Sequence, residues 1–292
     1  MPVGTEFKAS NSRVLLYGNP KTMKTTWAIH SAIKAGYIVV FFNGDNGIPP
    51  FVINSLGKEE LERLYIVNCV DKHRIANFVT MMSYIMQQKT VIWDDEDNQF
   101  ANITKNKKHD HLVIKPSLFN KNYCVIVDSY TKLVQSTNEQ FAISNNIDLS
   151  EAIKTSWNGY GEQGRWLDWF LKSMSNFPCA FIVIAHASEH ERMEKDANDK
   201  TIRVPLGIWP ISSSRPHGRT IGQQFSDILY TDVLLDGSFV IDTRNLHNRQ
   251  GGARNIAPNI YSMSSVSLED VIGNVGIEKE DPVAGIEIVR GE

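Results

Sequence analysis

The chain has 292 residues, 42% of them hydrophobic, which is enough to bury a core in one large domain or two small ones. Its formal net charge of −3 excludes a globally basic surface, so nucleic acid would have to bind at local patches. The 3 cysteines show no metal-ligand spacing, which favours free thiols in a reducing compartment. The sequence shows neither a signal-like segment nor an apolar run near ~20 residues, so we expect a cytoplasmic protein with no membrane partner.

Short apolar runs alternate with amphipathic helical patterns along most of the chain. The predicted strands are residues 13–17, 37–43, 64–70, 122–128, 179–186, 227–235 and 238–244, the last two as a closing hairpin. The predicted helices are residues 24–35, 73–88 and 163–176. Continuous apolar strands separated by helices predict an α/β fold, with a mostly parallel sheet covered on both faces.

Three segments interrupt this rhythm. Residues 89–115 hold two apolar runs around a charged middle and are interpreted as a β-hairpin insertion. Residues 188–220 are polar, proline- and glycine-rich and without a clear period, which predicts a long functional loop. After residue 258 the chain is acidic and weakly patterned. We therefore expect one domain over residues 1–258 and a loosely ordered tail over 259–292.

The segment YGNPKTMKTTW, residues 17–27, is close to the phosphate-binding pattern G-x-x-x-x-G-K-[ST]. A predicted strand precedes it and a predicted helix follows it, which is the context that the pattern requires. Backbone N–H groups at the start of such a helix bind phosphate, Lys24 would reach the β- and γ-phosphates, and Thr25 would ligate Mg²⁺. The expected nucleotide-binding set is Gly18, Asn19, Pro20, Lys21, Thr22, Met23, Lys24, Thr25 and Thr26.

Met23 departs from the pattern because it stands where the second glycine belongs. Glycine lets the backbone approach phosphate closely, so a methionine predicts weaker or slower handling of ATP and Mg²⁺ rather than none. An ordinary strand-to-helix turn with two solvated lysines is the alternative.

Asp128 ends the buried apolar run NYCVIVD. A carboxylate at the carboxyl end of a strand lies where open α/β sheets bind their ligands, and it would hold the metal ion through water. Alone this pattern is common, but together with the loop it indicates a nucleotide site.

These motifs resemble the RecA-like P-loop ATPases, and most closely the phage-type RecA-like NTPases of single-strand DNA annealing and recombination. The segments that carry the resemblance are LLYGNPKTMKTT, VVFFNGDNG, VIVDSYTKL, FIVIAHASEHE and TRNLHNRQGGAR, which occur in the family's order between about residues 13 and 256. The resemblance implies a Mg²⁺-dependent, DNA-stimulated ATPase that forms a ring or a filament of identical subunits. Its implied partners are single-stranded DNA and, as a further candidate, a single-strand-binding protein.

The resemblance also assigns roles to single positions. Asp45 falls where the family has its catalytic glutamate, which orients and deprotonates the attacking water. A residue of the turn NGDNG is the alternative. His186 ends the strand that in this family lies between the strands of Gly18 and Asp128, where a polar side chain senses the γ-phosphate. A purely structural histidine is the alternative there.

The loop after His186 matches the family's second DNA-binding loop. Its later half, RVPLGIWPISSSRPHGR, combines basic groups with an aromatic ring and contains no acidic residue. This combination suits single-stranded nucleic acid, because cations bind phosphates and aromatic rings stack on bases. The expected contacts are Arg203, Trp209, Arg215, His217 and Arg219. A mobile lid or a subunit-contact loop is the alternative.

Completion of the active site by an arginine from a neighbouring subunit is a further expectation. Related ATPases supply such a cation in trans, and Arg249 and Arg254 follow the last predicted strand beside a Gly-Gly turn. Relatives often carry Lys-x-Arg here, whereas this chain has His247, Asn248 and Arg249. Two functional alternatives stay open: a ring-forming helicase or loader ATPase, and a degenerate nucleotide-binding scaffold without hydrolysis.

Overall fold

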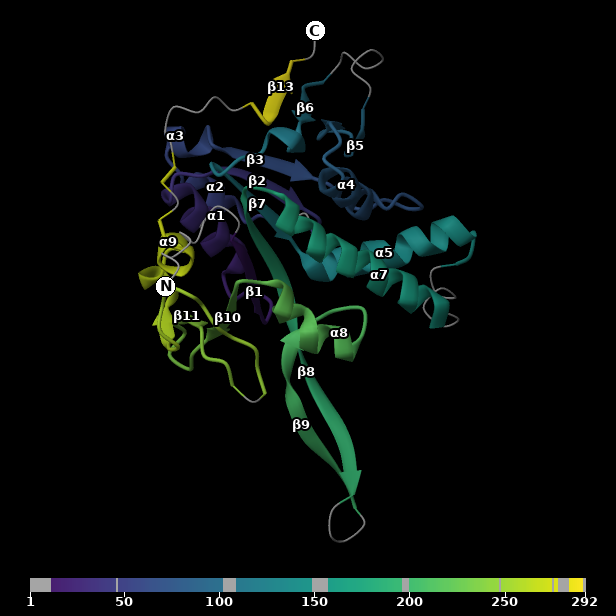
Figure 1. Ribbon diagram of the computed structural model, residues 1–292, viewed down its shortest axis with the longest axis vertical. Helices are drawn as coiled ribbons and strands as arrows, with labels where there is room; N and C mark the ends of the chain where they lie inside the picture. The colour runs from purple at the N-terminus through teal and green to yellow at the C-terminus, as the bar shows by residue number, and fades with distance from the viewer. Residues whose placement is uncertain are drawn as a thin grey trace, which may run out of the picture.

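A central β-sheet carries helices on both faces, and a long β-hairpin projects away from it (Figure 1). The computed structural model describes residues 12–45, 47–101, 109–148, 157–195, 200–246, 248–274, 276–277 and 284–290, without the side chains of residues 157–160 and 215. Within these residues, no helix has both the length and the apolar character that crossing a bilayer requires.

The main sheet is parallel through its centre. Its strands lie in the order β12 (Ile260–Ser262), β11 (Phe239–Asp242), β10 (Asp227–Val233), β1 (Arg13–Gly18), β8 (Ala180–Lys195), β7 (Tyr123–Asp128), β2 (Ile38–Asn43) and β3 (Leu64–Asn68), with β9 (Thr201–Pro210) paired to β8. The pairs from β10 to β3 are parallel, whereas β11, β12 and β9 pair antiparallel. The predicted α/β fold with a mostly parallel sheet is confirmed.

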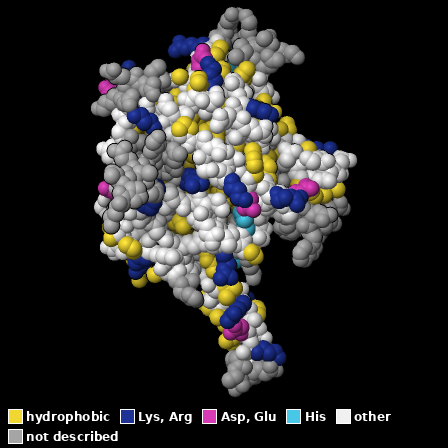
Figure 2. Space-filling view, viewed as in Figure 1, with side chains coloured by type: hydrophobic (Ala, Val, Ile, Leu, Met, Phe, Trp, Pro, Cys, Tyr) yellow, Lys and Arg dark blue, Asp and Glu magenta, His cyan; other side chains and the backbone are white. Residues whose placement is uncertain are grey.

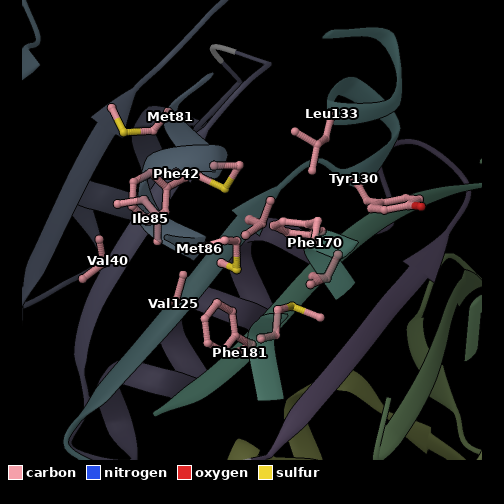
Figure 3. Packing of buried hydrophobic residues seen from close by; sticks show 14 of the residues in the cluster. Val40, Phe42, Met81, Ile85, Met86, Val125, Tyr130, Leu133, Phe170 and Phe181 are labelled. Carbon is pink, nitrogen blue, oxygen red and sulfur yellow. The ribbon is translucent and has the colours of Figure 1, made fainter. Parts of the chain in front are cut away.

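Both faces of the sheet are buried, as the continuous apolar strands require. One face packs against α1 (Lys24–Lys34), α2 (Pro50–Asn54) and α9 (Leu268–Ile272). The other packs against α4 (Asn77–Met86), α5 (Tyr130–Asn145) and α7 (Trp157–Ser173), and Figure 3 shows side chains of this core. Short helices α3 (Lys58–Leu61) and α8 (Arg215–Thr220) and four 3₁₀ turns connect these elements.

A smaller antiparallel sheet contains the predicted insertion. Its order is β13 (Ile286–Val289), β6 (His111–Ile114), β4 (Val91–Asp94) and β5 (Gln99–Phe100). The two apolar runs of residues 89–115 pair directly with each other as β4 and β6. The sheet also takes in β13 from the far end of the chain, through four residue pairs from Ile286↔Ile114 to Val289↔His111.

The expected loosely ordered tail is wrong for the described residues after 258. β12 extends the main sheet, α9 packs against α1, and β13 closes the smaller sheet. The physical reason is tertiary burial: Leu268, Val271 and Ile286 are buried, although isolated apolar residues among polar ones give little periodicity in the sequence.

The loop predicted over residues 188–220 is also wrong for residues 188–195 and 201–210, which form strands. β8 continues past the sheet to Lys195 and pairs antiparallel with β9, from Ala187↔Pro210 to Lys195↔Thr201. Most residues of this hairpin beyond His186 are at least partly exposed, so it needs no alternation of apolar and polar residues. The sequence therefore lacked the usual strand signal there.

Candidate functional site

The expected nucleotide-site residues come together at the carboxyl edge of the central strands. Gly18 pairs with His186 across β1 and β8, and Asp128 pairs with Asn43 across β7 and β2. β8 lies between β1 and β7, which confirms the strand order that the RecA-like resemblance implied. Parallel strands that end together place their following loops around one site.

The loop between β1 and α1 has a backbone suited to anions. Lys21 and Met23 have φ values of 64° and 61°, whereas Thr22 between them is not in the positive-φ region. Such alternation produces a concavity of backbone N–H groups, and the N-terminus of α1 adds its dipole. Met23 thus adopts the left-handed conformation that a glycine would adopt easily. Its side chain packs against the core beside α1.

β10 fixes where the loop starts. Gly18 lies against Thr231, and a Cβ at Gly18 would approach the Thr231 carbonyl oxygen to 2.2 Å, so no larger residue fits. The Thr231 hydroxyl also lies 2.7 Å from the Thr22 hydroxyl.

Lys24 is held inside the loop. Its Nζ donates to the carbonyl oxygens of Gly18 (3.1 Å) and Asn19 (2.6 Å) and to the Thr22 hydroxyl (3.2 Å). Burial lowers the pKa of Lys24 to about 8, against the opposing effect of the Asp128 carboxylate. The hydrogen-bond partners of the ammonium group are thus two carbonyl oxygens and one hydroxyl, all uncharged. A phosphate oxygen is charged and accepts a stronger hydrogen bond, so it can replace them.

Thr25 and Asp128 form the candidate metal site. The Thr25 hydroxyl donates to Asp128 Oδ2 at 2.6 Å. Burial raises the pKa of Asp128 to about 6, partly offset by the Thr25 hydrogen bond. Among the described residues, no three His, Cys, Asp or Glu side chains cluster as metal ligands. A hydroxyl and one carboxylate, completed by waters and phosphates, fit Mg²⁺, which usually binds in this way.

Asp45 and His186 lie beside this pair. Ser129, directly after Asp128, donates its hydroxyl to Asp45 Oδ2 at 2.9 Å, and Asp45 is exposed. Burial and the nearby Lys24 charge lower the pKa of His186. The Nδ1 atom of His186 is buried and has no hydrogen-bond partner among the described residues. The site thus places an exposed carboxylate and a neutral imidazole next to the loop lysine.

A cavity of about 510 Å³ opens beside the phosphate-loop helix. It is lined on one side by Met23, Thr26 and His30 of the loop and α1, and on the other by residues 262–267 and Phe239. Its volume is in the range of small-molecule sites, so it is large enough for a nucleoside.

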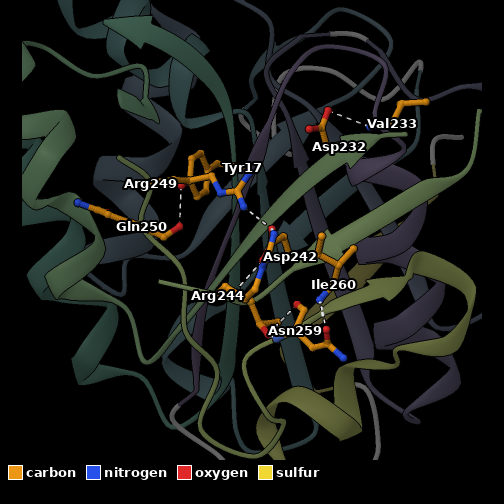
Figure 4. Close-up of polar contacts among 10 residues, drawn as sticks. Tyr17, Asp232, Val233, Asp242, Arg244, Arg249, Gln250, Asn259 and Ile260 are labelled. Carbon is orange, nitrogen blue, oxygen red and sulfur yellow. Dashed lines mark hydrogen bonds and ion pairs between the residues drawn. The ribbon is translucent and has the colours of Figure 1, made fainter. Parts of the chain in front are cut away.

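Arg249 does not fit the role of a cation for a neighbouring subunit. Its guanidinium pairs with Asp242 (Figure 4). It also lies 4.3 Å from the ring centre of Tyr230, and the side chain is 12% exposed. These contacts tie the segment after β11 to the sheet. The expectation that Arg249 acts in trans is therefore corrected, because the side chain is buried in an intramolecular ion pair.

Arg254 is likewise engaged within the chain. It pairs with the buried Asp227 at 3.0 Å and donates to the Ser12 hydroxyl at 2.9 Å. Asp227 opens β10, at the end of the sheet opposite the phosphate loop. The expected catalytic role of Arg254 is corrected to a structural ion pair, since Asp227 would otherwise be a buried, unpaired charge.

Trp209 and His217 are not free to contact a base. Trp209 is 6% exposed, and its ring lies 4.9 Å from the His190 ring and 5.1 Å from the Arg219 guanidinium. His217 bridges Asp168 (2.9 Å) and Ser212. Base stacking by Trp209 is therefore corrected to packing at the root of the hairpin, where the large ring gains more by burial than by exposure.

Arginines remain exposed along and beside the projecting hairpin. Arg203 on β9 makes an exposed ion pair with Glu191 at 3.6 Å, and Arg192 pairs with Glu194. Figure 2 shows basic and acidic side chains along the hairpin. Arg219 is exposed beside Trp209. The side chain of Arg215 and residue His247 lie outside the described structure.

Two site residues escaped the sequence analysis. Ser129 had a usable signal, because a hydroxyl directly follows the metal carboxylate at a strand end. Thr231 had none, since its proximity to the loop depends on β10 pairing with β1, where Gly18 and its partner Thr231 are 213 positions apart in the sequence (231 − 18).

Comparison with known proteins shows a likeness among solved structures. No family model matches the chain, and no curated protein matches it. Among solved structures, the chain is similar to the RadB recombinase, with a TM-score of 0.42 and 17% sequence identity over 82% of this chain and 84% of that one. At this identity the likeness concerns the fold alone.

Proposed function

We propose that the protein binds and hydrolyses ATP with Mg²⁺ and acts on single-stranded DNA in recombination or annealing. The observation that carries the proposal is the joint placement of Lys24 and the Thr25–Asp128 pair at the N-terminus of α1. A lysine within a nest of N–H groups and a hydroxyl–carboxylate pair are what a nucleoside triphosphate and its Mg²⁺ require.

Each side chain has a role that its position permits. Lys24 exchanges its backbone acceptors for phosphate oxygens, and Thr25 and Asp128 hold Mg²⁺, which would neutralise charge on the β- and γ-phosphates. Asp45 is exposed and held by Ser129, so it is placed to orient and deprotonate an attacking water. His186, at the root of the hairpin, is placed to sense the γ-phosphate. The cavity beside Met23 takes the nucleoside.

The hairpin of β8 and β9 supports the DNA part of the proposal. It starts directly after His186, so one continuous strand connects the nucleotide site to an exposed arm. The ion pairs of Arg192 and Arg203 with glutamates are exposed, and such pairs contribute only ~0–1 kcal/mol, so phosphates can displace them. Binding along a strand of DNA would also agree with the ring or filament of identical subunits that the resemblance implies.

ATP turnover tests the enzymatic proposal. Wild-type protein should hydrolyse ATP only with Mg²⁺ and faster with single-stranded DNA, and Lys24→Ala should lose turnover. Lys58→Ala, at an exposed position on α3 outside the lining of the cavity, is the matched control and should keep wild-type activity. Binding without turnover would support a scaffold instead, whereas strand unwinding would support a helicase.

Salt dependence tests the DNA proposal. Replacing Arg203, Arg215 and Arg219 with alanine should flatten the log–log salt slope by about 2, as expected for three lost phosphate contacts. A control with alanine at the exposed Lys58, Lys89 and Lys172 removes the same charge elsewhere and should keep the slope. An unchanged slope in the arginine variant would move the DNA site away from the hairpin and α8.

A further inference from the structure

Thr231 stands out among the residues that contact the phosphate loop, because it belongs to a different strand and carries no charge. It is fully buried at the carboxyl end of β10, where it pairs in register with Gly18. Neither the loop pattern nor the metal carboxylate accounts for a hydroxyl at this position. A valine side chain would have nearly the same shape, and burying its methyl group would cost less free energy than burying the threonine hydroxyl.

The hydrogen bonds around Thr22 indicate whether the Thr231 hydroxyl donates or accepts. Thr22 Oγ1 donates its single proton to the Asn19 carbonyl oxygen at 2.9 Å. With that proton used, Thr22 Oγ1 accepts from Lys24 Nζ at 3.2 Å and from Thr231 Oγ1 at 2.7 Å, a much shorter contact than the 3.4 Å from Thr231 Oγ1 to the Tyr17 carbonyl oxygen. Thr231 is thus the outer donor of a chain that runs from β10 through Thr22 to the loop backbone.

We propose that Thr231 is a positioning residue for nucleotide binding, which acts through Thr22 on the phosphate loop and on Lys24. This inference rests on the proposed ATP site and deepens it. The Thr22 hydroxyl anchors the loop to the sheet while Lys24 exchanges its partners for phosphate. Without the Thr231 donor, the loop samples more conformations, and ordering it again costs part of the binding free energy.

The test compares variants that change only this hydroxyl. Thr231→Val should weaken MgATP binding about fivefold, the effect of one net hydrogen bond, and raise KM more than it lowers kcat. Thr231→Ser restores the donor and should return the affinity to within about twofold of wild type. A merely structural role would not give rescue by serine together with an effect confined to KM.

Thr243→Val is the matched control. Thr243 is also fully buried, and its hydroxyl donates to backbone carbonyl oxygens of Ala257 (3.0 Å) and Asn259 (3.2 Å), away from the loop. This variant should keep the wild-type affinity for MgATP. Thr22→Ala removes the inner link and should show a similar loss, and the Thr22→Ala/Thr231→Val double variant should lose no more than Thr22→Ala alone.

The outcomes separate this inference from the proposed function. Wild-type protein that binds no MgATP would overturn the proposed function and the inference together. Wild-type binding with unchanged affinity in folded Thr231→Val would overturn the inference alone. A Thr231→Ser variant as weak as Thr231→Val, or additive losses in the double variant, would also contradict it.

Discussion

Met23 keeps a left-handed backbone at the place where the phosphate-loop pattern has a glycine. For a residue with a Cβ this conformation costs roughly 1–2 kcal/mol. The flexible side chain packs against the core and lines the cavity beside α1. The departure from the glycine pattern therefore has a cost in backbone strain.

Substitutions at Met23 should reverse the usual order of stability, in which an alanine variant is more stable than a glycine variant. Both Met23→Ala and Met23→Gly lose the side chain, but only alanine keeps the strain, so the glycine variant should be more stable by about 1 kcal/mol. Chemical denaturation measures the difference. At Thr26, inside α1, alanine should instead be more stable than glycine by up to ~1 kcal/mol. The same order at both positions would show that Met23 is unstrained.

Asp128 makes the stability of the nucleotide-free protein depend on pH. Burial raises its pKa from 3.8 to about 6, so the folded state binds the proton more tightly than the unfolded state. This contribution is complete below pH 3.8 and is lost as the pH rises through about 6, so the buried carboxylate is destabilising above that value.

Asp128→Asn should therefore raise the free energy of unfolding at pH 8 by about 2–3 kcal/mol and change it little at pH 4. Thermal melts without nucleotide at the two pH values test this. Asp236→Asn, on the exposed turn between β10 and β11, is the control and should not raise the Tm at either pH. A Tm of Asp128→Asn that is not raised at pH 8 would contradict the assigned pKa.

At the scale of elements, the smaller sheet joins the last described strand of the chain to strands between residues 91 and 114. β13 pairs with β6, and the Gly285 N–H donates to the hydroxyl of the buried Tyr123 at 2.8 Å. Ile286 is 3% exposed and Ile288 is 55% exposed. The same strand therefore has a buried isoleucine to test and an exposed isoleucine as the control.

Ile286→Ala should destabilise the protein by about 2–4 kcal/mol, because it leaves a cavity between the strand and the core. Ile288→Ala removes the same atoms from an exposed site and should change the stability by less than about 0.5 kcal/mol. Equal effects of the two substitutions in denaturant titrations would mean that residues 284–290 do not pack as described.

The accuracy of the sequence prediction differed between kinds of element. Strands such as β2 and β7 were predicted because all their residues are buried and all but the last are apolar. The resemblance placed the strand of His186 between those of Gly18 and Asp128, as the structure has it. The β8–β9 hairpin and β13 were missed, since pairing in exposed or isolated segments leaves no periodic signal. For the site, local spacing identified Lys24, Thr25 and Asp128. The partners of Arg249, Arg254 and Thr231 depend on tertiary contacts, which spacing alone does not encode.

At the scale of the whole molecule, the carboxyl edge of one sheet connects the proposed nucleotide site to an exposed arm. β1 leads into the loop that contains Lys24, β7 ends at Asp128, and β8 runs between them and out into the hairpin (Figure 1). In the proposed function, a single strand therefore links the bound nucleotide to the hairpin. The proposed function depends on the binding of a nucleoside triphosphate at the carboxyl edge of this sheet.

Calorimetric titration of ATP into the protein with Mg²⁺ tests that dependence most directly. We predict saturable binding of one ATP per chain by wild type and by Lys58→Ala, and no detectable binding by Lys24→Ala. The difference follows because Lys24 supplies the central positive charge for the phosphates, whereas Lys58 is an exposed lysine on α3 outside the lining of the cavity. Wild-type protein that releases no binding heat with millimolar MgATP, or Lys24→Ala that binds as wild type does, would contradict the nucleotide site.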